Sequence, residues 1–336
     1  MELYSYGPSV WSSIVENETS NVVQSSSWVI ELGEEETADT SAFVVPFEIG
    51  RVKSLIQESI PPAQSKVIAV ASGKGGTGKT TITTNLAISL QSIGLRVLVI
   101  DADFGLANDH LLLGVETKGD IGDVLAGRKD LKDILVECPS GMYLLPGGVG
   151  SSHLSELEEH EWKTFSRELS CLEPSFDVIL VDLAAGVSPQ IMRFLTPAHG
   201  IILVTNPEIT AMMDAYGLVK CLDSWSSHQA VEVQVILNRV KDRRDSLLAI
   251  QKLRKVVAKH LTSVKMNYLG YIPYDHYLLH SISIQEPVVL SHPRSFVTAC
   301  LKGIAQKIYH QFRAWEKIQE EEAIYKSYFG LLEPKS

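Results

Sequence analysis

Unbroken runs of aliphatic and β-branched residues recur along the chain, and segments with helical spacing of apolar positions lie between them. Such runs are typical of strands buried on both faces of a parallel sheet. They occupy residues 66–71, 96–101, 176–182, 200–205 and 233–238, with a shorter one at 142–148. Helical segments are predicted from residue 79 to Gly94 and over 151–172, 245–260 and 296–318. The alternation predicts an α/β fold with a doubly wound, mainly parallel sheet flanked by helices.

Composition divides the chain into three segments. Residues 1–60 are an acidic N-terminal extension whose first 50 residues contain no Lys or Arg. We expect a flexible tail there, and the alternative is a segment that becomes ordered on a partner. Residues 61–318 form the main domain. The apolar and aromatic tail, 319–336, is expected to dock on the protein's own surface, with reversible membrane contact as the alternative.

Overall composition excludes several classes of protein. The chain has 336 residues and is 45% hydrophobic, enough for a substantial core. Its net charge of −10 predicts no general attraction to nucleic acid or anionic membrane. The four cysteines are isolated in sequence, which argues against a disulfide framework or an iron–sulfur site. Without a signal sequence or an 18-residue apolar run, we expect a cytoplasmic location, with a peripheral place at the inner membrane face as the alternative.

A glycine-rich segment, 72–81, separates the first strand from the first helix and reads Ser-Gly-Lys-Gly-Gly-Thr-Gly-Lys-Thr-Thr. Its glycines let backbone N–H groups turn toward a phosphate, and the helix that follows adds the positive end of its dipole. Lys79 is expected to reach the β- and γ-phosphates, and the Thr80 hydroxyl to ligate Mg²⁺. The predicted nucleotide-binding residues of this P-loop are Gly75, Gly76, Thr77, Gly78, Lys79, Thr80 and Thr81.

Aspartates follow two of the predicted strands. Asp101 and Asp103 come at the end of the strand 96–101, and Asp182 ends an apolar run in the Walker B pattern. Ligands of open α/β sheets bind at the carboxyl ends of the strands. Asp182 is therefore expected to hold Mg²⁺ through water. For Asp103, the alternative to a role in ligand binding or catalysis is a carboxylate that caps the next turn.

The first lysine of the loop, Lys74, completes the sequence Lys-Gly-Gly-Thr-Gly-Lys-Thr, which resembles the deviant Walker A motif of the MinD/ParA superfamily of P-loop ATPases. The resemblance covers roughly residues 66–310 and implies ATP and Mg²⁺ as cofactors. It also implies slow ATP hydrolysis and a homodimer that forms with ATP, in which Lys74 reaches the partner subunit's phosphates. A lysine from each subunit would offset the repulsion between two facing nucleotides. A solvated loop lysine is the alternative.

The same resemblance implies roles for the strand-end carboxylates. Asp103, the second aspartate of a DxD pattern, would position the attacking water, so the catalytic residues would be Lys74, Lys79 and Asp103. Asp101 would lie nearer the metal, so the Mg²⁺ residues would be Thr80, Asp101 and Asp182.

Five further residues match the family's switch, interface and base-binding segments. Gly186 would let the second switch approach the γ-phosphate, and Glu208 and Asp214 would line the dimer interface. Asn238 would hydrogen-bond adenine, and Pro273 lies in a segment, 268–275, that resembles the loop packed against the base. For Asn238, a strand-end turn residue is the alternative.

The only strongly basic stretch lies between residues 239 and 259. A helix over 245–260 would place Lys252, Lys255 and Lys259 on one face. We expect a solvated face, and the alternative is a docking site for DNA or an acidic partner.

Three segments, 103–108, 204–216 and 272–275 with 293–295, resemble the flagellar-number regulators (the FlhG/FleN type) of this superfamily. The resemblance implies a switch that regulates flagellum number or placement through an unidentified protein partner in flagellar assembly or transcription. The short Gln-rich N-terminal motif of some members is missing, which puts one such partnership in doubt. The alternatives are a ParA-type partitioning or division-site ATPase and a non-hydrolysing nucleotide-binding scaffold.

Overall fold

The computed structural model describes residues 65–104, 106–148, 157–226 and 230–311. All of them belong to one compact unit, Ile60–Ser336. The predictions made for the extension 1–60 and the tail 319–336 lie outside the described residues.

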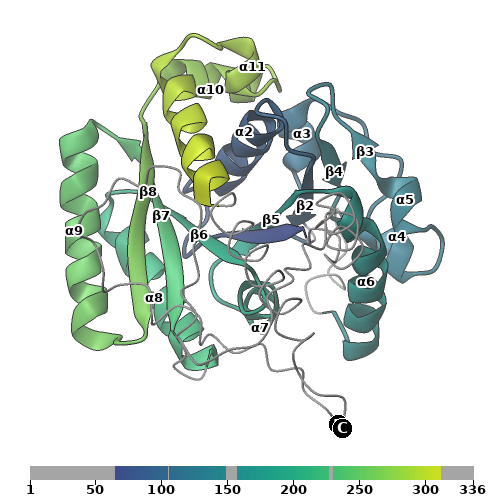
Figure 1. Ribbon diagram of the computed structural model, residues 1–336, viewed down its shortest axis with the longest axis horizontal. Helices are drawn as coiled ribbons and strands as arrows, with labels where there is room; N and C mark the ends of the chain where they lie inside the picture. The colour runs from purple at the N-terminus through teal and green to yellow at the C-terminus, as the bar shows by residue number, and fades with distance from the viewer. Residues whose placement is uncertain (1–64, 105, 149–156, 227–229, 312–336) are drawn as a thin grey trace, which may run out of the picture. The chain divides into compact units, whose positions relative to one another are not determined.

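One eight-stranded sheet runs through the described residues (Figure 1). Its strands are β1 (Lys66–Ser72), β2 (Val97–Ala102), β3 (Val136–Glu137), β4 (Tyr143–Leu145), β5 (Val178–Ala185), β6 (Gly200–Thr205), β7 (Val231–Val240) and β8 (Val264–Pro273). They lie in the order β3-β4-β2-β5-β1-β6-β7-β8, and every neighbouring pair is parallel except β3 and β4. The predicted doubly wound, mainly parallel sheet is confirmed.

Helices cover both faces of this sheet (Figure 1). They are α2 (Lys79–Gln91), α3 (Asp109–Leu113), α4 (Ile121–Leu125), α5 (Leu131–Ile134), α6 (Glu159–Leu172), α7 (Pro189–Leu195), α8 (Ile209–Trp225), α9 (Arg243–His260), α10 (His276–Ser283), α11 (Val288–Ser291) and a final helix over 296–311. A short 3₁₀ turn, Glu173–Ser175, precedes β5.

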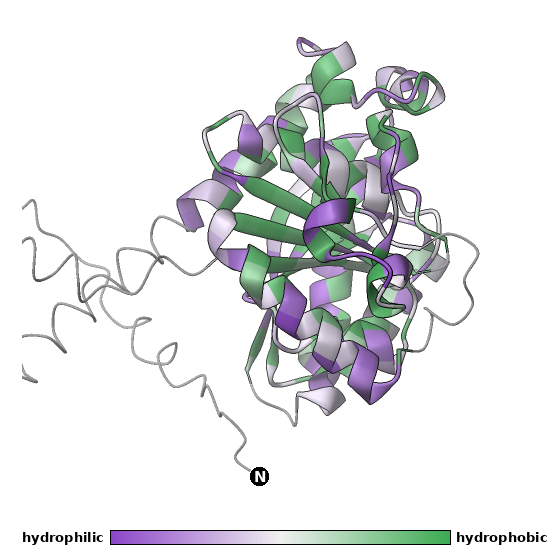
Figure 2. Cartoon of the chain, turned by 90° about the vertical axis from the view of Figure 1, so that its right-hand side faces the viewer, coloured by the Kyte–Doolittle hydropathy of each residue, from purple (hydrophilic) through white to green (hydrophobic). Residues whose placement is uncertain are grey.

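Two apolar clusters form the core, one on each face of the sheet. Successive residues of β1 alternate between them: Ala69 belongs to the cluster that includes residues of α6, α7, α8 and α9, whereas Val70 belongs to the cluster that includes residues of α2, α11 and the helix 296–311. Figure 2 shows apolar residues concentrated on the strands, whereas the helices carry both apolar and polar residues. The central strands are therefore buried on both faces, as their continuous apolar runs predict.

The prediction that the segment 268–275 is a loop is wrong for most of its length. Tyr268 to Pro273 belong to β8, which pairs with β7 in parallel register. Leu269 and Ile272 point into the core, and this burial favours an extended, paired backbone over a loop. Helix α6 begins at Glu159, where Glu158 and Glu161 form a capping box. The expected start of that helix, at 151, falls on residues outside the described ranges.

Candidate nucleotide-binding site

The glycine-rich loop joins the end of β1 to the start of α2. Gly78, the residue before α2, has a φ of 89°. A Cβ on Gly78 would lie 2.2 Å from the amide nitrogen of Asn238. That amide donates a hydrogen bond to the carbonyl of Thr77 at 2.7 Å. The end of β7 therefore fixes the conformation of the loop, and only glycine fits at position 78.

Helix α8 contacts the other end of the loop. A Cβ on Gly73 would lie 2.2 Å from the backbone carbon and oxygen of Asp214. Lys74 donates from Nζ to Oγ1 of Thr210 at 2.9 Å, and the same nitrogen lies 3.6 Å from the Glu208 carboxylate. Three of the predicted residues, Lys74, Glu208 and Asp214, are thus brought together where the loop meets the first turns of α8.

Lys79 and Asp182 form a buried ion pair. Lys79 Nζ lies 2.7 Å from a carboxylate oxygen of Asp182, and their side chains are 6% and 1% exposed. The hydroxyl of Thr80 donates to the same oxygen at 2.7 Å, and that of Thr83 donates to the other oxygen at 2.7 Å. Burial alone would lower the pKa of Lys79, but the attraction and hydrogen bond of Asp182 outweigh it and the pKa is raised. Lys79 is therefore held as a cation at the floor of the loop.

A group of buried carboxylates surrounds this pair. Oxygens of Asp101, Asp109 and Asp182 all lie within 4.8 Å of one another. Asp101 accepts three backbone N–H bonds from the turn after β2. Asp109 is 0% exposed, and neither of its carboxylate oxygens has a hydrogen-bond partner among the described residues. Oxygen donors beside the Thr80 hydroxyl suit Mg²⁺, and the two oxygens of Asp109 without a partner among the described residues are further candidate ligand atoms.

Burial changes the ionisation of these aspartates. Burial and the nearby charge of Asp182 raise the pKa of Asp101 to about 7. Burial and the Asp101 charge raise the pKa of Asp109 well above its ordinary value. The side chains are kept apart from solvent, and their charges are costly unless a cation faces them.

Asp103 differs from these three because it lines the open pocket. Its side chain is half-buried, and its carboxylate forms no hydrogen bond with any residue that the structure describes. Burial raises the pKa of Asp103, and the Lys79 charge opposes the rise. The next residue, Phe104, packs edge-on against Phe165 and Phe194, with ring centres 6.4 and 6.1 Å away. These rings anchor the turn to α6 and α7 and leave the Asp103 carboxylate available for a ligand.

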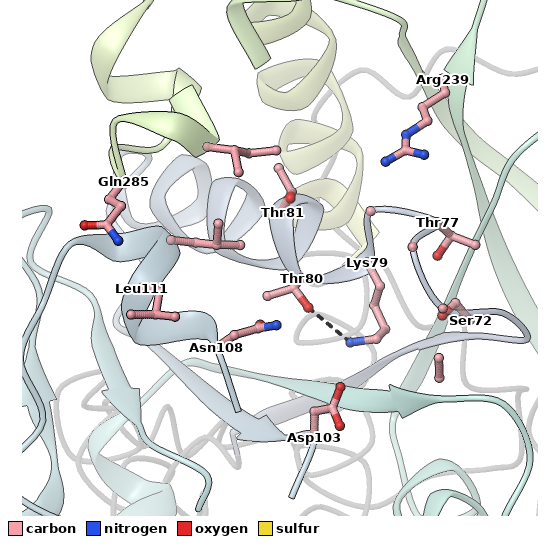
Figure 3. A pocket seen from close by; sticks show the side chains of 16 residues that line it. Ser72, Thr77, Lys79, Thr80, Thr81, Asp103, Asn108, Leu111, Arg239 and Gln285 are labelled. Atoms are coloured by element: carbon pink, nitrogen blue, oxygen red, sulfur yellow. Dashed lines mark hydrogen bonds between the residues drawn. The ribbon is translucent and has the colours of Figure 1, made fainter. Parts of the chain in front are cut away.

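A pocket of about 500 Å³ opens between the loop, Asp103, α3 and the end of α10 (Figure 3). Its lining contains every predicted nucleotide-binding residue from Gly75 to Thr81, together with Asp103. The lining also contains Ser72, Asn108, Leu111, Leu112, Ala185, Arg239, Ile282 and Gln285. The phosphate-binding loop and the predicted water-positioning carboxylate therefore face one cavity.

The remaining predicted residues lie around this cavity. Gly186 follows β5 with a φ of 98°, and its N–H donates to the Ser72 carbonyl at 2.9 Å. Asn238 is buried, and both ends of its amide are engaged, with Thr77 and with the backbone N–H of Arg239 at 2.8 Å. Pro273 is the last residue of β8. Among the described residues, neither Asn238 nor Pro273 belongs to the pocket lining.

Sequence reasoning missed Asp109, Arg239 and Gln285 as site residues. Asp109 begins a short apolar helix, so its sequence neighbours indicate a surface or capping position. Arg239 is the last residue but one of β7, and Gln285 lies two residues after the end of α10, both in segments without a recognisable motif. Their backbone conformations, with φ angles of 54° and 56°, are visible only in the folded chain.

The fold and the site together define a P-loop nucleotide-binding protein of the α/β class. The chain matches the CobQ/CobB/MinD/ParA nucleotide binding domain over residues 68–288. It therefore belongs to that family, whose members use ATP and Mg²⁺, and the predicted MinD/ParA membership is confirmed.

An antiactivator and a flagellum site-determining protein are among the similar proteins. The antiactivator FleN of Pseudomonas aeruginosa is 35% identical over 250 residues, which cover 74% of this chain and 88% of FleN. The flagellum site-determining protein YlxH of Helicobacter pylori is 36% identical over 209 residues, 62% of this chain and 69% of YlxH.

Solved structures of MinD share the fold. The cell division ATPase MinD of Pyrococcus furiosus superposes with a TM-score of 0.62 at 28% identity and covers 74% of this chain and 99% of its own. The MinD of Pyrococcus horikoshii, solved with Mg-ADP, gives a TM-score of 0.61 at 30% identity, with coverage of 73% and 96%. No helix among the described residues is long and apolar enough to cross a membrane.

Proposed function

We propose that this protein is an ATP hydrolase that works as a slow molecular switch, dimeric with ATP and monomeric after hydrolysis. The observation that carries the proposal is that the pocket has two separate groups of side chains, which suit different tasks. Lys79 and Asp182 form a buried pair, joined by the half-buried Thr80, that suits a phosphate and its metal, while the Asp103 carboxylate lines the cavity without a hydrogen-bond partner among the described residues. A carboxylate in that position suits the positioning of a water.

Catalysis in such a site depends on positioning and charge. Mg²⁺, held by Thr80 and Asp182, would neutralise charge on the phosphates. Lys79 would add its own positive charge to the β- and γ-phosphates, and the loop would supply backbone N–H groups. Asp103 would orient the attacking water. None of the described pocket residues is a histidine or a second free carboxylate, so slow turnover is expected.

Dimerisation is supported by exposed apolar side chains beside the site. Ile209 and Met213, on the first turns of α8, are 82% and 61% exposed, and Leu106 is 76% exposed. Ile209 and Met213 lie on the helix that Lys74 contacts, and Lys74 is not part of the pocket lining of its own chain. A second copy of the chain would cover these side chains and bring Lys74 to the opposite nucleotide.

The test is phosphate release from ATP by the full chain, with Lys79→Ala and Asp103→Ala. Wild type should release phosphate slowly, and both variants should release none above background. Asp103→Ala should still bind ATP, whereas Lys79→Ala should not. An Asp103→Ala variant with wild-type hydrolysis would contradict the assignment, and an inactive wild type that binds ATP would favour the scaffold alternative.

For the process that the switch regulates, we propose flagellum number or placement. Support comes from the identity with FleN and YlxH over most of the ATPase domain. The partner would be a protein of flagellar assembly or of transcription, because FleN is named as an antiactivator. Deletion of the gene should change the number or position of flagella if the organism has them, and a cell with unchanged flagella and disturbed division would favour the division-site alternative.

A partitioning role remains the alternative because α9 carries an exposed basic face. Lys252, Lys255 and Lys259 are exposed on this helix, as the sequence predicts. DNA binding through this face would be ATP-dependent, independent of sequence and weakened by salt. The triple change of these lysines to Glu should abolish such binding, and a wild type that does not retain DNA with ATP would exclude the role.

A further inference from the structure

The two edges of the sheet differ in length. At one edge, β3 has only two residues, which offer little backbone to another strand. At the other edge, beside α9, β8 has ten residues, and Lys265 is its only charged side chain (Figure 1). No strand among the described residues pairs with the outer side of β8. Because long, mainly uncharged edge strands are templates for pairing with another chain, this edge is where unwanted pairing would begin.

Two cationic side chains reach the backbone of β8 from opposite faces of the sheet. Arg254, on α9, donates from Nε to the Met266 carbonyl at 2.8 Å. Lys307, on the helix 296–311, donates from Nζ to the Leu269 carbonyl at 2.7 Å. The two helices contribute to different apolar clusters, so they cover different faces. Carbonyls on the open side of an edge strand have no backbone partner in the sheet, and here side chains take that place.

The strand is also irregular where Lys307 reaches it. The register of β8 against β7 shifts at Leu269, which has no opposite residue in β7. Such a bulge increases the local twist and disturbs the regular row of backbone groups that a further strand would need. The next residue, Gly270, lies so close to the helix 296–311 that a Cβ would be 2.6 Å from Ile304. This close approach places Lys307, one turn after Ile304, at the bulge.

The polar contacts of both cations are made with the strand. Lys307 Nζ also lies 6.0 Å from the centre of the Tyr268 ring, a favourable position for a cation. In the described part of the chain, neither Arg254 nor Lys307 forms an ion pair with a carboxylate. An approaching strand would have to break both hydrogen bonds to the carbonyls and would bury two positive charges without partners, which is costly.

We propose that Arg254 and Lys307 close the open edge of the sheet and prevent β8 from pairing with a strand of a second copy of the chain. The bulge at Leu269 supports the same effect by disturbing the backbone between the two bonded carbonyls and the end of the strand. Association of two chains is then restricted to other surfaces. The inference does not depend on nucleotide binding.

The test measures the mass of the full chain by light scattering, without nucleotide, over a range of protein concentrations. Arg254→Met with Lys307→Met keeps the aliphatic length of both side chains and removes both donors. Lys252→Met with Lys302→Met is the matched control, since these exposed lysines lie on the same two helices and the net charge changes equally. The mean mass of the first variant should rise about twofold or more, because pairing of two edges gives at least a dimer. The control should keep the wild-type mass, and so should Arg254→Lys with Lys307→Arg, which retains both donors.

Hydrogen exchange locates the contact. In the associated variant, backbone N–H groups of residues 264–273 should gain protection, whereas β1 and β5 should exchange as in wild type. A folded double variant with the wild-type mass would overturn the inference. Association that leaves the exchange of 264–273 unchanged, or an equal rise in mass in the control, would overturn it as well.

Single changes decide the question if the double variant is unfolded, which a loss of protection throughout the sheet would reveal. Arg254→Met and Lys307→Met each leave one of the two donors in place. Each should associate through residues 264–273 to a smaller extent than a fully open edge would. If both single variants are folded and keep the wild-type mass at all concentrations, the inference is wrong.

Discussion

The ammonium group of Lys79 lies 2.7 Å from the carboxylate of Asp182, and both side chains are almost completely buried. In this arrangement the cation that is expected to bind phosphates is neutralised inside the protein. ATP would have to exchange one anionic partner of Lys79 for another. The carboxylate that is released in this exchange is the one expected to face Mg²⁺.

Asp182→Asn should therefore destabilise the protein strongly when no nucleotide is present. Removing one partner of a buried ion pair leaves the other charge uncompensated and costs about 3–5 kcal/mol. ATP should recover much of this loss, because its phosphates supply negative charge to Lys79. The measurement is chemical unfolding of wild type and variant with and without ATP, in EDTA. An equal stability of both proteins without nucleotide would show that Lys79 does not depend on Asp182.

The buried aspartates predict an unusual pH dependence of stability. The pKa of Asp101 is raised to about 7 and that of Asp109 is raised well above 3.8. Between pH 4 and 7 the native state therefore binds more protons than the unfolded state, and the free energy of unfolding should fall as the pH rises. The curve should be recorded without nucleotide or divalent cations. Asp109→Asn should be more stable than wild type at pH 7, and its free energy of unfolding should depend less steeply on pH. A variant whose stability follows the wild-type pH curve would contradict the burial of this charge.

Gly73→Ala tests the contact between the loop and α8. The added Cβ would lie 2.2 Å from the backbone of Asp214, so the loop or the helix must move. Overpacking of this kind costs typically 1–3 kcal/mol. Gly75→Ala is the matched control, since a Cβ there meets no described atom within 4 Å. In thermal melts without nucleotide, the first variant should melt several degrees lower and the second should match wild type. Similar melting temperatures for the two variants would show that α8 can move away from the loop at little cost.

Ile209→Asp tests the proposed dimer surface. Light scattering should show Asp103→Ala as a dimer with ATP and Mg²⁺ and as a monomer with ADP. Adding Ile209→Asp should keep the protein monomeric with ATP, because a charge would be buried in the contact. Leu248→Asp, at an α9 residue that is 50% exposed, is the control and should leave the dimer unchanged. If Leu248→Asp also blocks dimerisation, the effect of Ile209→Asp is not specific to the proposed surface. If neither ATP nor ADP changes the mass of Asp103→Ala, the proposal that Lys74 reaches the opposite nucleotide in a dimer is wrong.

The sheet and the phosphate-binding loop could be predicted because they depend on local sequence. The apolar run at 200–205 coincides with β6, and the lining of the pocket contains each loop residue expected to bind nucleotide. The strand β8 was missed at 268–273 because its pairing with β7 is a tertiary contact that no local pattern shows.

The partners of the carboxylates could not be predicted either. Nothing near Asp109 in sequence indicates that it meets Asp101 and Asp182, which are paired residues of the adjacent strands β2 and β5. Gly73 similarly owes its identity to the backbone of a helix about 140 residues further along the chain, and the sequence shows it only as one glycine of a loop.

The contact between Gly73 and Asp214 joins the phosphate-binding loop directly to helix α8, which lies at the protein surface. Because the two backbones touch, and because Lys74 is bonded to Thr210, a displacement of the loop by phosphates has to be shared by the first turns of α8. Those turns carry Ile209 and Met213 on the outside. If a partner binds these turns, as proposed above, it would be two helical turns away from the phosphate-binding loop and would contact the helix that the loop touches.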